Sequence, residues 1–221
     1  FSKDAQGKMK MVPWTHITPI KSAADAWAHH DIQIGNIVAW PSSSEAVMAP
    51  WLIYASLLNG GTLALFEGKA LERNLGEFVQ NARVNILGVT SAQVKAWRSS
   101  KCMSGLDWSS IKCFSAAGGC SVAEDMHWLM AFAGYKPVIE YDGGLELGSG
   151  LVAGTLMQPQ APATFSTKTL GANFKLMNQE GKEATTGSLW PSKPVWGAIE
   201  TLLEKEKNFQ AFPNGYFRAL N

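Results

Sequence analysis

Two glycine-rich loops hold the residue types in this 221-residue sequence that are best suited to binding a ligand. Residues 116–120 read Ala-Ala-Gly-Gly-Cys, and residues 142–146 read Asp-Gly-Gly-Leu-Glu. Small residues let backbone amides approach a ligand, and the start of a helix favours an anion. Asp142 and Glu146 add carboxylates that could hold Mg²⁺ on a phosphate. Glycines also serve tight turns for purely structural reasons, so the loops alone leave both interpretations open.

Other reactive residue types give weaker signals. The four histidines have no partners at metal-binding spacing, which favours surface or core roles for them. There is no Gly-x-Ser-x-Gly turn and no paired cysteine and histidine that would indicate a nucleophile. The three cysteines, an odd number without metal spacing, fit a reducing compartment.

The loops must be positioned by alternating strands and helices. Apolar strand-like runs are followed by amphipathic helix-like runs from residue 18 to residue 142. We expect strands at 37–40, 62–66, 85–89, 111–115 and 138–141, and helices after Thr18-Pro19 and at 46–58, 71–82, 91–100 and 121–133. Ser121 and Glu124 have the spacing of a capping box for the last helix. This order predicts an α/β fold with a mainly parallel, helix-covered sheet, and both loops at the carboxyl ends of strands.

Beyond residue 150 the pattern changes to short segments separated by Gly and Pro, which predicts a smaller antiparallel β region. We therefore expect an α/β subdomain over 1–149, a small β region over 150–192, and a helical or irregular tail over 193–221.

Composition and charge exclude several classes of protein. Hydrophobic residues make up 46% and charged residues 17% of the chain, as in globular proteins. A net charge of +1 argues against a nucleic-acid partner. The longest apolar run is too short for a membrane span. Neither a secretion signal nor a peroxisomal C-terminal tripeptide is recognisable, so we expect an intracellular, possibly organellar, location.

The region around the second loop resembles a known family. Residues 136–146, Lys-Pro-Val-Ile-Glu-Tyr-Asp-Gly-Gly-Leu-Glu, are similar to the Tyr-x-Gly-Gly-Thr-Glu signature of the adenylate-forming acyl-activating enzymes, the acyl-CoA synthetases. The resemblance is strongest to the acetyl-CoA-synthetase-like, plant peroxisomal branch, and it runs from Phe1 to about Gly187. Residues 128–130, 134–137, 158–160 and 165–167 fit that branch in order and spacing.

The resemblance implies a set of nucleotide-binding residues. These are Gly7, Lys10, Gly118, Gly119, Tyr141, Asp142, Gly143, Gly144 and Glu146. Lys10 and Glu146 would be vestigial catalytic residues, and Glu146 would bind Mg²⁺ if a nucleotide binds.

The departures from the family pattern fall on the motifs that handle ATP. Residues 3–10 align with the phosphate loop Ser-Gly-Thr-Thr-Gly-x-Pro-Lys, but Asp4 brings a negative charge to a phosphate position. Leu145 replaces the signature threonine and cannot donate a hydrogen bond. A family Gly-Glu appears as Gly118-Gly119, and a Gly-Trp on the acyl side appears as Glu45-Ala46. The family's ribose-binding Gly-Asp motif and small C-terminal domain have no counterpart here.

These departures lead to three hypotheses. The first is a degenerate, non-catalytic AMP-binding domain that acts as a structural or binding subunit of a larger assembly and needs no cofactor. The second is a fragment of an ATP-dependent acyl-CoA ligase, which would use ATP, Mg²⁺ and CoA. The third is a vestigial sensor that binds a nucleotide or acyl group without turnover. The expected partners are other protein subunits or the remaining parts of an enzyme of this family. An interface anchor would come from six tryptophans: Trp14, Trp51, Trp97, Trp108, Trp190 and Trp196.

Overall fold

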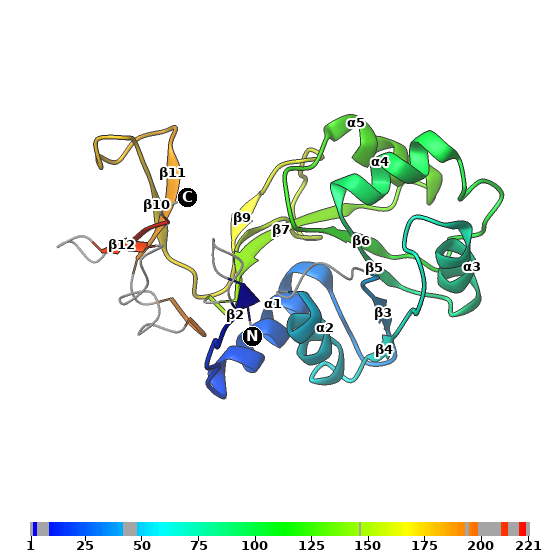
Figure 1. The fold of residues 1–221 in the computed structure, drawn as a ribbon, viewed down its shortest axis with the longest axis horizontal. Helices are drawn as coiled ribbons and strands as arrows, with labels where there is room; N and C mark the ends of the chain where they lie inside the picture. Colours follow the sequence, from blue (N-terminus) through cyan, green and yellow to red (C-terminus); the bar gives the residue numbers. More distant parts are fainter. Residues whose placement is uncertain are drawn as a thin grey trace.

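The main element of the fold is a seven-stranded sheet (Figure 1). The computed structural model describes residues 2–3, 9–41, 48–145, 147–192, 195–198, 209–211 and 217–219. The strands lie in the order β4-β3-β5-β6-β7-β8-β9. Their bounds are Ile37–Ala39 (β3), Thr62–Ala64 (β4), Ile86–Val89 (β5), Cys113–Ala116 (β6), Val138–Gly144 (β7), Ser149–Ala153 (β8) and Thr167–Lys168 (β9). Every pair of neighbours from β4 through β3, β5 and β6 to β7 is parallel, whereas β8 is antiparallel to β7 and β9 is antiparallel to β8.

In the part of the chain that the structure describes, five helices cover the sheet on both faces (Figure 1). They are α1 (Ile17–His30), α2 (Met48–Leu57), α3 (Arg73–Asn81), α4 (Ser91–Ser100) and α5 (Ala123–Phe132). In Figure 1, α1 and α2 lie on one face of the sheet, and α3, α4 and α5 lie on the other. This is the arrangement expected when each crossover between parallel strands is a helix.

The central strands are apolar on both faces because each face has its own core. Leu87, Phe114 and Val138 point into the core beneath α3, α4 and α5. Their neighbours along the chain, among them Ile86 and Ile139, point into the core beneath α1 and α2. Successive side chains of a strand alternate between the two faces, so continuous apolar runs are required here.

The remaining strands form two-stranded antiparallel sheets. These are β1 (Ser2–Lys3) with β2 (Met9–Lys10), β10 (Phe174–Met177) with β11 (Ser188–Pro191), and β12 (Phe209–Ala211) with β13 (Phe217–Ala219). The expected α/β class, with a mainly parallel sheet and a smaller antiparallel β region, is confirmed. β8 and β9 extend the large sheet across the subdomain boundary that we expected near residue 150.

The N-terminal ends of two helices differ from those predicted from the sequence. α5 begins after Val122 with no side-chain cap, and the Ser121 hydroxyl donates instead to Glu140 Oε2 at 2.8 Å. The capping box lies at α4, where Thr90 and Gln93 bond each other's backbone amides. The helix expected after Thr18-Pro19 already starts at Ile17, so Thr18 is not its N-cap, and the Thr18 hydroxyl donates to the Gly197 carbonyl at 2.9 Å.

Candidate functional site

The second glycine-rich loop lies in the hairpin formed by β7 and β8. The register between these strands shifts at Asp142 and Gly143, which is the geometry of a β-bulge. At Gly143 a Cβ atom would lie 2.1 Å from the Ser149 carbonyl oxygen. Glycine is therefore required at this position for the two backbones to approach so closely.

Tyr141 anchors this hairpin to both α1 and α2. Its hydroxyl donates to Asp25 Oδ2 of α1 at 2.9 Å. The same oxygen accepts the indole N–H of Trp51 on α2 at 3.0 Å and the backbone N–H of Gly150 on β8. Burial and the neighbouring Asp25 carboxylate raise the pKa of Tyr141 well above its usual value, so the phenol remains a donor.

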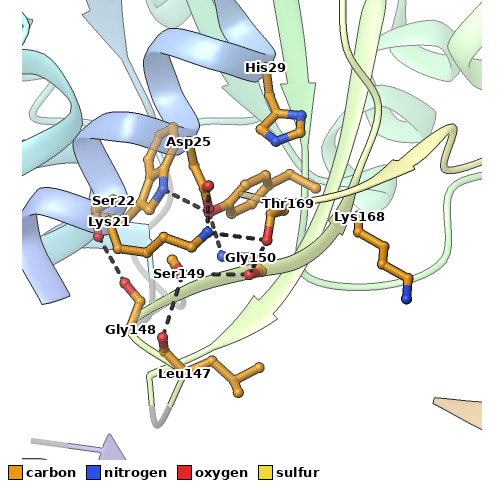
Figure 2. Close-up of polar contacts among 12 residues, drawn as sticks. Lys21, Ser22, Asp25, His29, Leu147, Gly148, Ser149, Gly150, Lys168 and Thr169 are labelled. Carbon is orange, nitrogen blue, oxygen red and sulfur yellow. Dashed lines mark hydrogen bonds and ion pairs between the residues drawn. The ribbon is translucent and has the colours of Figure 1, made fainter. Parts of the chain in front are cut away.

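A buried ion pair supports Tyr141 from α1. Lys21 Nζ lies 2.5 Å from Asp25 Oδ1, and both side chains are fully buried. Lys21 also donates to the Thr169 hydroxyl at 3.1 Å, and that hydroxyl donates to the Gly150 carbonyl at 2.7 Å (Figure 2). Because the ammonium and the carboxylate satisfy each other and further polar groups, this pair can be tolerated in the interior.

Two cavities share Tyr141 and Asp142 as lining residues. The first, which we call the inner cavity, has a volume of about 70 Å³. Its walls are mostly aromatic or backbone: Trp14, Met48, Trp51, Ala117, Gly118, Tyr141, Asp142, Gly143, Gly144, Gly148 and Ser149. An apolar space of this kind suits a small hydrocarbon group rather than a charged one.

The second, the outer cavity, is larger, at about 220 Å³. It is lined by Ala116, Gly118, Gly119, Cys120, Ser121, Glu140, Tyr141, Asp142, Ala163 and Phe165. Glu140 is its buried polar group: Oε2 accepts the Ser121 hydroxyl, and Oε1 has no hydrogen-bond partner of ordinary geometry. Burial raises the pKa of the Glu140 carboxyl, although the Ser121 hydroxyl and the Ala163 amide partly oppose the shift. A donor on a bound ligand would satisfy Oε1.

Leu145 packs inward at the turn after β7. Its side chain is 5% exposed, and its carbonyl oxygen accepts the Trp14 indole N–H at 2.9 Å. This residue therefore contributes packing and a carbonyl acceptor, and its side chain offers no donor to an anion.

The structure brings most of the expected nucleotide-binding residues together. Gly118, Tyr141 and Asp142 line both cavities, Gly143 and Gly144 line the inner one, and Gly119 lines the outer one. Lys10 ends β2. Gly7 and Glu146 lie outside the described residues, as do Asp4, Glu45 and Ala46. Binding by these residues remains a prediction.

Three residues that line the cavities were not predicted from the sequence: Glu140, Trp14 and Trp51. Glu140 had one available signal, because a carboxylate stands unusually within the apolar run 138–141 of a central strand. The two tryptophans had none, because they come from segments far from the loops in sequence.

Within the ranges given above, no group of three or more His, Cys, Asp or Glu residues is placed to hold a metal ion. No helix in that part of the chain is long and apolar enough to cross a bilayer.

The chain is similar in sequence to plant acyl-activating enzymes. No family model matches it. Over 208 residues, 92% of this chain, it is 44% identical to the "Probable acyl-activating enzyme 17, peroxisomal" of Arabidopsis thaliana and 42% identical to the "Hexanoyl-CoA synthase" of Cannabis sativa. The match spans only 29% of the length of each relative.

Solved structures show the same fold at lower identity. Acetoacetyl-CoA synthetase from Streptomyces lividans superposes with a TM-score of 0.76 at 16% identity, over 92% of this chain and 36% of that one. An anthranilate CoA ligase in complex with anthranoyl-AMP gives a TM-score of 0.70, also at 16% identity, over 94% and 44%.

Proposed function

We propose a function from the premise that this chain is homologous to one segment of the plant acyl-activating enzymes, which belong to the adenylate-forming acyl-CoA synthetases. The chain is a degenerate AMP-binding domain: it keeps binding cavities of the family but does not form acyl-adenylates. It acts as a structural or binding part of a larger assembly.

The single observation that carries this proposal is the environment of Leu145. In the family signature a threonine stands here, but the Leu145 side chain is buried and has no group that can bond a phosphate oxygen. Transfer of an adenylyl group depends on several donors acting together on the phosphates. Asp4 adds a negative charge to the segment that resembles the phosphate loop. Both changes disfavour the binding of ATP where the negative charge of its phosphates must be stabilised.

The cavities support retained binding. They share Gly118, Tyr141 and Asp142 as a common wall, so a ligand with an apolar end and a polar end could occupy both. The inner cavity suits the apolar end, and Glu140 in the outer cavity offers a hydrogen-bond acceptor. This arrangement also supports the sensor hypothesis, in which a nucleotide or acyl group binds without turnover.

An active ligase is the second candidate, because the chain is 42% identical to a relative named for making hexanoyl-CoA. On that hypothesis Lys10 and Glu146 act on ATP and Mg²⁺, and the acyl group passes to CoA. Two relatives are named as peroxisomal, which supports an organellar location for this chain.

Exchange of pyrophosphate into ATP separates the two candidates. The most direct test uses a hybrid enzyme in which this chain replaces the matching stretch of Cannabis sativa hexanoyl-CoA synthase. With hexanoate, we expect exchange no higher than in the Glu146→Ala hybrid, while the unaltered synthase serves as the positive control. Introducing Leu145→Thr together with Asp4→Gly should restore part of the exchange.

Clear exchange by the unmodified hybrid above its Glu146→Ala control would refute the non-catalytic proposal. Calorimetry with ATP, AMP and hexanoyl-CoA then tests retained binding in the same hybrid. Binding without exchange supports the sensor hypothesis, and absence of binding leaves a purely structural role.

A further inference from the structure

Cys120 is placed differently from the other two cysteines of the chain. It lines the outer cavity and is exposed. Cys113 is fully buried in β6, and burial raises the pKa of its thiol to about 12. Cys102 lines neither cavity, and its thiol donates to the Leu71 carbonyl oxygen at 3.5 Å. Because a cysteine reacts as its thiolate and needs access to its target, Cys120 is the cysteine best placed to react with a bound ligand.

The backbone before Cys120 leaves room for such a ligand. Gly119 has a φ of 142°, which residues with a side chain rarely adopt, and a Cβ atom placed there would meet nothing within 4 Å apart from its chain neighbours. Gly118, with a φ of 82°, lines both the outer and the inner cavity. The two glycines therefore add no side chain to the space beside the thiol.

A second group in the outer cavity calls for a hydrogen-bond donor on the ligand. Glu140 is 4% exposed, and its Oε2 accepts the hydroxyl of Ser121, the residue that follows Cys120. Its Oε1 is buried, lacks a hydrogen-bond partner of ordinary geometry, and belongs to a residue that lines this cavity. An unsatisfied buried acceptor is costly, and an N–H group of a ligand would remove that cost. The cavity thus combines a nucleophile with an acceptor that a ligand can satisfy.

A thioester of CoA or of a similar thiol matches both groups. In these thiols a short ethylene spacer joins the sulfur to an amide nitrogen, so an N–H group lies near the thioester carbonyl. Glu140 Oε1 can accept this N–H while the carbonyl carbon lies at Cys120. The acyl group then has the inner cavity beside it, and its apolar walls suit a small hydrocarbon group. Disulfides of small thiols also carry amide groups, but they have no hydrocarbon group for the inner cavity.

We propose that Cys120 accepts a short acyl group from a CoA-type thioester, and that Glu140 Oε1 binds the amide N–H of the departing thiol. The Cys120 thiolate attacks the carbonyl carbon, and the bond from that carbon to the sulfur of the thiol breaks. The released thiolate takes from water a proton equivalent to the one that Cys120 has lost. One thioester replaces another, so the step consumes neither ATP nor an oxidant. The inference rests on the proposed retention of the cavities and is independent of the loss of adenylate formation.

The test measures acylation of the isolated 221-residue chain without ATP. The probe is the hexanoyl thioester of N-acetylcysteamine, which carries the amide N–H, and mass spectrometry of peptides gives the rate at each cysteine. We expect Cys120 to be acylated at least about tenfold faster than Cys102 or Cys113, and neutral hydroxylamine should release the acyl group as it does from thioesters. Cys120→Ser should abolish this label, whereas the matched control Cys102→Ser should leave it unchanged.

A second probe isolates the contribution of Glu140. S-ethyl thiohexanoate has the same acyl group but no amide N–H. Cys120 should prefer the N-acetylcysteamine thioester by at least about threefold more than free N-acetylcysteine does, as expected for one added hydrogen bond. Glu140→Leu should remove this preference, and Glu140→Gln, which keeps an acceptor oxygen, should retain it. The ratio is taken within each protein, so a general change in thiol reactivity cancels.

Three outcomes overturn the proposal. In the first, all three cysteines are acylated at equal rates, as in an unfolded chain. In the second, Cys120 of the parent chain shows the same preference between the two probes as free N-acetylcysteine, which decides against the site even if Glu140→Leu does not fold. In the third, Cys120 forms a mixed disulfide with glutathione disulfide but is not acylated, which assigns the site to disulfide exchange. Pyrophosphate exchange by the hybrid tests the proposed function separately, because the acylation assay contains no ATP.

Discussion

The residues at the end of β7 control the charge and the hydrogen bonding of the two cavities. Tyr141 is held by three hydrogen bonds, and Gly143 admits the backbone of β8. Glu140 sits beneath the outer cavity with a buried carboxyl group whose ionised form is disfavoured. The site therefore combines a side chain held by three hydrogen bonds, Tyr141, with one carboxylate oxygen, Glu140 Oε1, to which a bound ligand could still donate a hydrogen bond.

Replacing Glu140 should alter the pH dependence of stability. Burial raises the folded-state pKa of Glu140 above its ordinary value of 4.5. As pH rises above that value, the unfolded chain loses its proton first, so the free energy of unfolding falls until the folded-state pKa is passed. Glu140→Gln should remove this fall and make the hybrid more stable than its parent at pH 7, but not at pH 4.

Thermal melts of the parent and variant hybrids across pH 4–8 measure this effect. Ser121→Ala serves as the control, because it removes the donor to Glu140 but keeps the carboxyl. Parallel curves for the parent and Glu140→Gln would contradict the assigned cause of the shift.

Sequence reasoning at the residue scale succeeded where one motif lies within one loop. The run 141–144 was identified because its residues are consecutive, and the structure gathers them with Gly118 and Gly119. It missed Trp14, whose indole reaches Leu145 across 131 positions of sequence, because such a contact depends on tertiary packing. Among the six tryptophans proposed as anchors, Trp51, Trp97, Trp108 and Trp190 are 2% exposed or less, whereas Trp27, which was not among them, is exposed.

At the scale of elements, the strands and helices follow the local pattern closely, but their orientation does not. The helix predicted over 91–100 is α4, with the same bounds. The helix expected after Thr18-Pro19 is present as α1, yet its large apolar residues Ile20 and Trp27 lie on the outer side. Periodicity shows which residues share a face, but it assumes that apolar faces point inward. The polar partners of α1 lie on β6 and β7 and next to the ends of β8 and β9. A local pattern does not contain these partners, and they decide the orientation of the helix.

The buried Lys21–Asp25 pair should be the main polar link between α1 and the sheet. Lys21→Met leaves the Asp25 carboxylate buried without its counter-charge and should cost roughly 3–5 kcal/mol of stability. The double substitution Lys21→Met with Asp25→Asn should cost less than Lys21→Met alone. The asparagine is neutral and still accepts the Tyr141 hydroxyl at the position of Oδ2.

Denaturant unfolding of the hybrid and its variants gives the three free energies that this comparison needs. The exposed pair Lys175–Glu183 offers a matched control, since Lys175→Met should change stability by about 1 kcal/mol or less. A double variant less stable than Lys21→Met would show that the charge on Asp25 is stabilised by something other than Lys21.

At the scale of the whole molecule, the two faces of the sheet differ in completeness. The core beneath α3, α4 and α5 is closed by helices whose outer surfaces carry ion pairs. The core beneath α1 and α2 is closed by helices whose outer surfaces carry none in the described residues. The large sheet is shared by both, so the α1–α2 layer is the part whose stability depends most on what covers it.

Hydrogen exchange should reveal this asymmetry directly. In the isolated chain the outer side of α1 and α2 is open to water. Local opening of these helices therefore newly exposes only the apolar surface of the inner core. We expect the remaining parts of the hybrid enzyme to cover this side, so this cover must be displaced first, which raises the free energy of opening. We expect backbone amides of α1 and α2 to exchange at least about tenfold more slowly in the hybrid than in the isolated chain, whereas amides of α4 should exchange at similar rates in both. Exchange followed by mass spectrometry at peptide resolution measures the two regions in one experiment, with α4 as the internal control. Equal protection of α1 and α2 in both contexts would mean that the layer needs no cover, and uniform slowing that includes α4 would indicate general stabilisation instead of a local interface.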